Sequence, residues 1–144
     1  MTAWDKIVKG LAAAGGAIAG LFGGMDTALI VLMSFMAIDY ASGLVVGWMG
    51  KSSKTENGHL DSYVGFVGIA KKVLMLLLVL VAALLDRALG TEAAVFRSLV
   101  IWFYISNEAI SILENLSTAG VPFPRKLRQA LEKLHDDNDG KDVG

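Results

Sequence analysis

Residues 73–85 read VLMLLLVLVAALL and contain no polar side chain, which restricts the surroundings in which this chain can fold. Two more runs, 27–38 and 40–49, are separated only by Asp39, and a further apolar region covers 93–116. A helix rises about 1.5 Å per residue, so roughly 20 apolar residues cross the hydrocarbon core of a bilayer. A soluble bundle would need polar outer helices to shield these runs, and only the C-terminal end is polar enough. The pattern predicts a membrane protein.

Composition supports this prediction and excludes several functional classes. Hydrophobic residues make up 54% of the chain, mean hydropathy is +0.55, and the net charge of −1 provides no basic field for nucleic acid. Cysteine is absent, and neither His59 nor His135 has a second ligand at metal spacing. Nucleophile-elbow, phosphate-loop and zinc-protease motifs are also missing. We therefore expect no enzyme activity, no cofactor, no metal site and no nucleic-acid partner.

The loops and prolines that separate the apolar runs predict an all-α polytopic membrane fold. A transmembrane domain, 1–121, is expected to hold four helices in two hairpins, separated by the polar loop 50–62. The sequence VPFP ends the fourth helix because proline cannot continue it. Residues 122–144 are expected to form a cytoplasmic amphipathic surface helix, at 124–137, and a disordered acidic tail. The four expected transmembrane helices cover about 5–24, 26–49, 64–89 and 92–116.

Basic residues predict the orientation, because cytoplasmic segments of membrane proteins are enriched in Lys and Arg. With four crossings, all the basic clusters fall on one side, which places both termini in the cytoplasm. Lys71 and Lys72 are expected to snorkel to one interface, with Asp86 and Arg87 at the other. If the first helix does not cross, the N-terminus lies outside or on the membrane surface. The clusters comprise Lys6, Lys9, Lys51, Lys54, Lys71, Lys72, Arg125, Lys126 and Arg128.

Glycine is concentrated in the first helix, where the segment 15–24 reads GGAIAGLFGG. On a helical wheel, Gly16, Gly20 and Gly24 share one nearly bare face, opposite a face of bulky apolar residues. Small residues let helices approach closely within a membrane, where burial from water does not drive association. Gly43 and Gly47 repeat this spacing in the second helix. Such faces serve packing within a subunit, packing between subunits, or the wall of a water-filled pore, and the sequence leaves all three open.

Polar residues inside the apolar segments are the candidate functional residues. Asp39 lies near the middle of the second helix, and a charge at the bilayer centre costs at least about 2.5–3.5 kcal/mol. The fourth helix carries a stripe of polar residues, all within about 40° of the line through Arg97 on the helical wheel. Only Ile101 interrupts this stripe. The stripe forms either an inter-helix hydrogen-bonding seam or the wall of an aqueous path. Asp39 with Arg97 is a candidate ion pair, and Asp39 with Glu108 a candidate proton relay. The stripe comprises Arg97, Tyr104, Glu108, Ser111 and Asn115.

Three segments together resemble the toxin-secretion/phage-lysis holins, which are small membrane proteins of phages and related bacterial elements. They read FMAIDYASGLVVGW (35–48), SYVGFVGIAKKVLMLLLVLVAALLD (62–86) and FYISNEAISILENLSTAGVPFPRKLRQALEKL (103–134). The last is the most specific, since GVPFP and a basic amphipathic helix follow a polar end of the final span. The loop at 51–62 departs from the pattern by being longer and more polar.

The resemblance implies a location and a function. Holins accumulate in the bacterial cytoplasmic membrane and assemble at a set time into lesions, which depolarise it and release endolysin for host cell lysis. Related members are implicated in toxin secretion. The implied partners are membrane lipid, further copies of the chain, and an endolysin or toxin. Two other readings remain: a small ion channel or proton-coupled transporter using Asp39 and Glu108, and a non-conducting scaffold whose C-terminal helix docks a partner.

Overall fold

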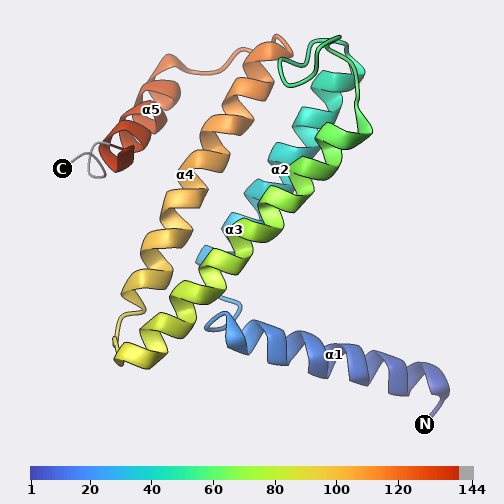
Figure 1. Cartoon of the computed structure of the whole chain (residues 1–144), viewed down its shortest axis with the longest axis vertical. Helices are drawn as coiled ribbons and strands as arrows, with labels where there is room; N and C mark the ends of the chain where they lie inside the picture. The colour runs from blue at the N-terminus through green and yellow to red at the C-terminus, as the bar shows by residue number, and fades with distance from the viewer. Residues whose placement is uncertain (140–144) are drawn as a thin grey trace.

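The computed structural model describes residues 1–139 and contains five α-helices, with no β-strand among these residues. Figure 1 shows three long helices, α2, α3 and α4, forming an elongated bundle, with α1 and α5 at its periphery. The expected helix ranges differ from the observed ones by three residues or fewer. The helices are α1 (Ala3–Leu21), α2 (Thr27–Trp48), α3 (Ser62–Leu89), α4 (Val95–Thr118) and α5 (Arg125–Asp139).

The core of the bundle lies mainly between α2 and α4, with α3 packed against α4. Leu32 of α2, Val79 of α3 and Ile101 of α4 are each 0% exposed and form its centre. Leu29 and Met36 extend this cluster one turn to either side along α2. The core is therefore a narrow seam along the axis of the bundle, made by one side of each helix.

The outside of the bundle is apolar as well. Leu74, Leu77 and Val81 of α3 are 63%, 48% and 57% exposed, and Ile30 of α2 is 50% exposed. Soluble monomers rarely present such continuous apolar surface to water. Two helices, α2 and α3, are long and apolar enough to cross a membrane. The bundle thus has the character of a membrane domain, with polar groups inside and apolar groups outside.

Side chains at the helix starts explain where the helices begin. The carboxylates of Asp26 and Asp61 accept hydrogen bonds from the third backbone amides of α2 and α3, each at 3.0 Å. The start of α4 differs, because Ala94 provides no side-chain cap. Asp86 of α3 instead accepts from the backbone amides of Phe96 and Arg97, at 3.0 and 2.8 Å. This buried carboxylate ties the end of α3 to the beginning of α4.

The first helix ends earlier than expected, at Leu21. Gly23 and Gly24 follow it with φ of 87° and 98°, which glycine adopts without the steric penalty of other residues. Gly24 therefore belongs to the α1–α2 turn, and its expected place on the glycine face of the helix is wrong. Gly16 and Gly20 remain on α1.

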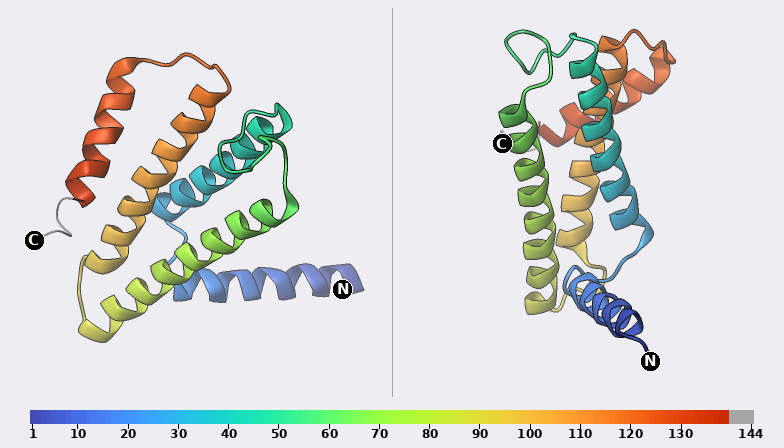
Figure 2. Two further views of the ribbon diagram at one scale, coloured as in Figure 1. Left: turned by 45° about the horizontal axis from the view of Figure 1, so that its top comes forward. Right: turned by 90° about the vertical axis from the view of Figure 1, so that its right-hand side faces the viewer.

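The two peripheral helices have few partners in the bundle. Figures 1 and 2 show α1 leading away from the foot of the bundle, and α1 has no buried residue. Its link to α3 includes a hydrogen bond from Arg87 to the carbonyl oxygen of Gly20. At the other end, α5 turns back beside α4. The α5 helix continues to Asp139, into the segment expected to be disordered, and 140–144 lie outside the described residues.

Truncation of the central isoleucine tests whether packing along this seam stabilises the bundle. Ile101→Ala should lower the free energy of unfolding in detergent micelles by about 2 kcal/mol. This loss is at the low end of the range for a cavity in a protein core. The outer surface of the bundle faces lipid or detergent and not water, so the loss comes mainly from missing packing contacts. Leu99→Ala is the matched control, since Leu99 lies on the same helix and is 66% exposed. Equal losses in the two variants would contradict the described packing.

Candidate functional site

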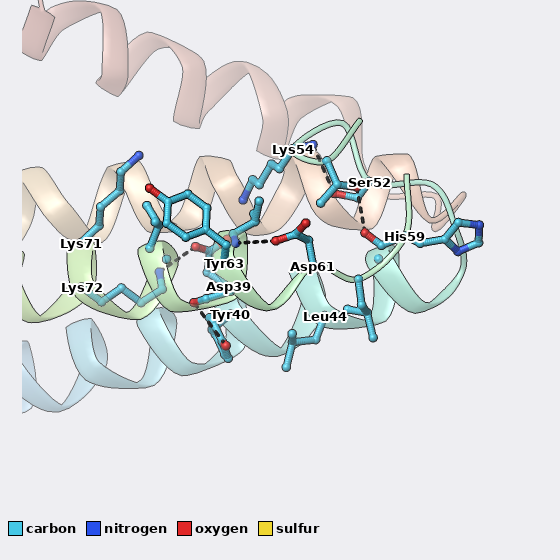
Figure 3. Close-up of a pocket in the computed structure, with 18 of the residues that line it drawn as sticks. Asp39, Tyr40, Leu44, Ser52, Lys54, His59, Asp61, Tyr63, Lys71 and Lys72 are labelled. Atoms are coloured by element: carbon cyan, nitrogen blue, oxygen red, sulfur yellow. Dashed lines mark hydrogen bonds and ion pairs between the residues drawn. The ribbon is translucent and has the colours of Figure 1, made fainter. Parts of the chain in front are cut away.

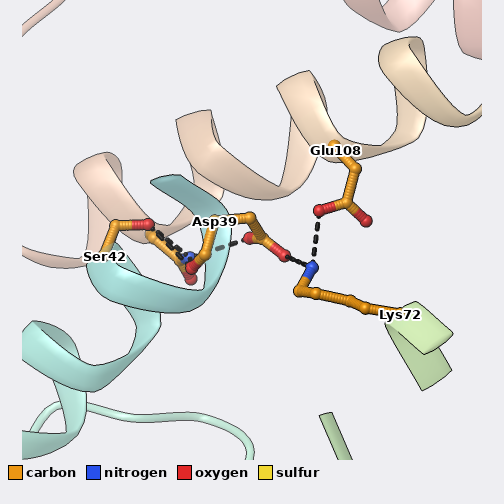
Figure 4. Close-up of polar contacts among 5 residues, drawn as sticks. Asp39, Ser42, Lys72 and Glu108 are labelled. Carbon is orange, nitrogen blue, oxygen red and sulfur yellow. Dashed lines mark hydrogen bonds and ion pairs between the residues drawn. The ribbon is translucent and has the colours of Figure 1, made fainter. Parts of the chain in front are cut away.

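A cluster of three charged side chains joins the three bundle helices. The Lys72 ammonium of α3 donates to the Asp39 carboxylate of α2 at 2.8 Å and to the Glu108 carboxylate of α4 at 2.6 Å (Figure 4). The side chains of Asp39 and Glu108 are 9% and 8% exposed, and that of Lys72 is 17% exposed. One ammonium thus links all three helices at a single point.

Neutral polar groups complete the surroundings of Asp39. The Asn115 side-chain amide donates to Oδ1 and to the backbone carbonyl of Asp39, both at 3.1 Å, and to the Ser42 hydroxyl at 2.9 Å. Gly43 lies beside this amide, and an added Cβ would make an ordinary van der Waals contact with its nitrogen at 3.7 Å. Both oxygens of Asp39 therefore face donors.

The cluster lies deep within the bundle. Asp39 is about 18 Å along α2 from Thr27 and about 14 Å from Trp48 at 1.5 Å per residue. Removing one partner of an ion pair at this depth leaves a buried charge without a counter-ion. The free-energy cost of such a charge is far higher than at a surface. The cluster can therefore hold the three helices together strongly while all its members are present.

A pocket of about 580 Å³ connects this cluster with the loop between α2 and α3 (Figure 3). Lys54 and His59 of the loop line its outer part, and Asp39, Lys72 and Glu108 line its inner part. Gly43, Gly47, Gly65 and Gly68 also line it, together with Leu60, which lies against Gly47, and Tyr40, which lies against Gly65 and Gly68. The charged groups near the middle of the bundle therefore border a pocket that also extends to the loop.

A second polar cluster fastens the foot of the bundle. The Arg97 guanidinium of α4 binds the Asp26 carboxylate at 2.8 Å and donates to the backbone oxygens of Phe22 and Gly24. The same contact holds the pKa of Asp26 below its usual value. A lowered carboxyl pKa means that this contact stabilises the fold above that pKa and is lost as the pH falls through it.

The polar stripe expected on α4 is present, but its residues have other partners than expected. Arg97, Glu108 and Asn115 are buried, and Tyr104 and Ser111 are half-buried, so the stripe faces the bundle interior. The candidate ion pair between Asp39 and Arg97 is wrong, because Asp39 binds Lys72 and Arg97 binds Asp26. The interfacial position expected of Lys72 is also wrong, since its ammonium lies in the cluster. Lys71 beside it is exposed.

The predicted glycine and surface residues fall into two groups. An added Cβ would meet no atom within 4 Å at Gly16 or Gly20, so this face of α1 is open. At Gly47 it would lie 2.8 Å from Leu60, so Gly47, like Gly43, admits a neighbour within the same chain. The basic residues Arg125, Lys126 and Arg128 of α5 are exposed, as a surface helix requires.

Sequence reasoning missed three contributors to the site. The pattern of lysines predicts an interfacial position for Lys72, and no pattern in the sequence points to Asp26 as the partner of Arg97. Tyr40 was not singled out, although it packs against α3 where Gly65 and Gly68 leave space for its ring. The spacing of three residues between these two glycines, on one side of α3, was the available signal.

The fold and the cluster together define a helical membrane protein with a buried charge network. A model of the bacteriophage holin family matches residues 16–136. An uncharacterized 14.9 kDa protein of Clostridium perfringens is 42% identical over 92% of this chain and 95% of its own length. A probable holin of Bacillus phage phi105 is 30% identical over 78% of each chain. No solved structure matches the chain.

The chain therefore belongs to the bacteriophage holin family, which is a non-enzymatic family of membrane pore formers. Membership confirms the expectation that the chain is not an enzyme. It also agrees with the resemblance drawn from the three sequence segments, all of which lie within the matched range.

Two adjacent lysines allow a matched test of the charge cluster. Lys72→Met should lower the free energy of unfolding in micelles at neutral pH by about 3 kcal/mol, because two buried carboxyl groups lose their counter-ion. This is the low end for a broken buried pair, since the carboxyl groups can take up protons. Lys71→Met removes a neighbouring exposed lysine and should change stability by less than about 0.5 kcal/mol. Equal effects would show that the bridge is not what holds the helices.

Proposed function

We propose that the chain is a holin that assembles in the bacterial cytoplasmic membrane into lesions, which depolarise the membrane and release an endolysin or a toxin. The family match over 16–136 carries this proposal, and the similarity to a probable phage holin supports it. The arrangement of the bundle is compatible with it, because polar groups suited to line water are held inside a single subunit. The membrane lipid and further copies of the chain are the direct partners.

We further infer four membrane crossings with both termini in the cytoplasm. The α4 helix lies along α2 and α3 for most of its length, and its charged residues Arg97 and Glu108 are buried in the bundle. Its outer surface carries Leu99 and Trp102, which are 66% and 62% exposed and suit contact with lipid. The α1 helix is 19 residues long, within the length range that can cross, and carries Asp5, Lys6 and Lys9 near its N-terminal end. The basic clusters then fall on the cytoplasmic side.

The proposed mechanism begins from the closed bundle. The α4 stripe makes its polar contacts within the subunit, so a newly inserted copy presents an apolar surface to lipid and does not conduct. Assembly separates these contacts and exposes the stripe to water, where hydration replaces the lost partners. Exposed basic residues on α5, including Arg125, Lys126 and Arg128, would hold the C-terminal helix at the anionic membrane surface.

The α1 helix is the proposed assembly element. Its small-residue face is open around Gly16 and Gly20, and none of its residues is buried against the rest of the chain. Close approach of helix backbones across such a face yields packing contacts that lipid does not offer. Gly43 and Gly47, in contrast, are used by neighbours within the chain and are a weaker choice for contacts between subunits.

A small ion channel or proton-coupled transporter is the second candidate function. One observation favours it: the cluster of Asp39, Lys72 and Glu108 lies at the inner end of a pocket that begins at the loop. Ionisable residues within a membrane commonly mark ion or proton paths. The two functions differ in what passes through the membrane, because a relay conducts small ions whereas a holin lesion admits a folded enzyme.

Controlled expression in bacteria tests the proposed function directly. Cells that produce the chain together with a cytoplasmic endolysin should show a delay, an abrupt loss of membrane potential, and lysis recorded as falling turbidity. Cells without endolysin should depolarise but keep their turbidity. Depolarisation without endolysin-dependent lysis would replace the holin proposal with a small ion path.

A pair of substitutions tests the assembly face on α1. Gly20→Leu should delay or abolish lysis, because the larger side chain prevents close approach of two helices. Ala14→Leu is the matched control, since Ala14 lies about 40° from Ile18 on the bulky face at roughly 100° per residue. Onset times are compared at equal amounts of membrane-inserted protein. Unchanged lysis with Gly20→Leu would remove this face from the mechanism.

A further inference from the structure

The charges of the buried cluster do not balance. Asp39 and Glu108 bind the same Lys72 nitrogen, so the cluster carries one excess negative charge if both carboxyl groups are ionised. The two carboxyl groups also lie close enough to interact with each other. Close carboxylates in a region shielded from water repel strongly, and an unbalanced charge at this depth is costly. A proton on one of the two carboxyl groups removes both penalties.

The hydrogen bonds identify which carboxyl group accepts the proton. Asp39 has a donor at each oxygen, since Asn115 reaches Oδ1 and Lys72 reaches Oδ2. An acidic hydrogen on Asp39 would face one of these donors. In the described part of the chain Glu108 accepts one hydrogen bond, from Lys72 to Oε2 (Figure 4). Its other oxygen can carry a hydrogen without displacing a donor.

We propose that Glu108 is a proton-binding site, which exchanges with the solution on the side of the 50–62 loop through the pocket above the cluster. Asp39 and Lys72 remain charged and form the permanent ion pair. The pocket offers the route, because residues of the loop and Glu108 line the same space. The other charged or titratable groups along it are Tyr40, Lys54, His59, Asp61, Tyr63 and Lys71, and Tyr104 lies one turn along α4 from Glu108.

The proposal gives the bundle a definite response to pH. Removing the proton from Glu108 restores the repulsion with Asp39 and leaves the cluster with a net negative charge. The stability that the neutral cluster provides is therefore present at low pH and lost when the pH rises enough to remove the proton. This inference does not depend on lesion formation, because it concerns the closed subunit alone.

Infrared spectroscopy of the full chain in lipid vesicles tests the site. At neutral pH we expect a carbonyl-stretch band of a protonated carboxyl group, shifted when carbon-13-labelled glutamate is incorporated and unshifted with labelled aspartate. Glu108→Gln should remove the band. Glu114→Gln should retain it, since Glu114 is on the same helix but exposed. Absence of the band in the wild-type chain, or a shift with labelled aspartate, would overturn the proposal.

Thermal unfolding in micelles provides a second, independent readout. Gln resembles protonated Glu, so Glu108→Gln should match the wild-type unfolding temperature at acid pH, where glutamate is protonated in both the folded and the unfolded chain. At neutral pH the wild-type chain should unfold at a lower temperature than Glu108→Gln, because its glutamate loses the proton on unfolding. Asp39→Asn should unfold at a lower temperature at every pH, because an NH₂ group would face either Lys72 or Asn115. If Glu108→Gln destabilises the chain as much as Asp39→Asn at neutral pH, Glu108 is ionised and the proposal fails.

Discussion

The rest of the bundle depends on the two ion pairs that the Lys72 ammonium makes with Asp39 and Glu108. Lipid is as apolar as the outer faces of α2, α3 and α4, so exclusion from water contributes little to holding these helices together once they are inserted. Packing along a narrow seam and directional polar contacts must serve instead. The lysine bridge joins all three helices at one depth, and the Arg97–Asp26 contact fixes them again at the foot.

In the proposed mechanism, this arrangement keeps a holin subunit from conducting before assembly. The polar residues that suit a water-filled lesion are the same ones that close the bundle, so they cannot do both at once. A copy whose cluster is intact presents an apolar surface, whereas α1 extends away from the bundle with its small-residue face uncovered. Closed and assembled states would then compete for one set of polar contacts.

Much of the fold followed from the sequence, because apolar runs and helix-breaking residues determine where membrane helices begin and end. The polar stripe on α4 followed from helical periodicity alone. The partners of the residues in this stripe did not follow from the sequence, because they depend on the register in which each helix packs against its neighbours. Lys72 resembled an interfacial lysine because the apolar run begins at Val73. In the structure Lys72 lies about 15 Å inside α3, and its ammonium meets Asp39 and Glu108. The expected start of this helix at 64 is close to the observed start at Ser62, so the error lies in the partners of Lys72 and not in the helix bounds. Gly24 was misplaced because helical spacing continued beyond the true end of α1.

The most direct test of this account is the time at which endolysin-dependent lysis begins in cells that express the Lys72→Met chain, compared with Lys71→Met at equal membrane levels. If the bridge keeps the subunit closed, its loss should bring lysis forward, while the Lys71 variant should keep the wild-type onset. The same onset for both lysine variants, or a later one for Lys72→Met, would show that opening this cluster does not limit lesion formation.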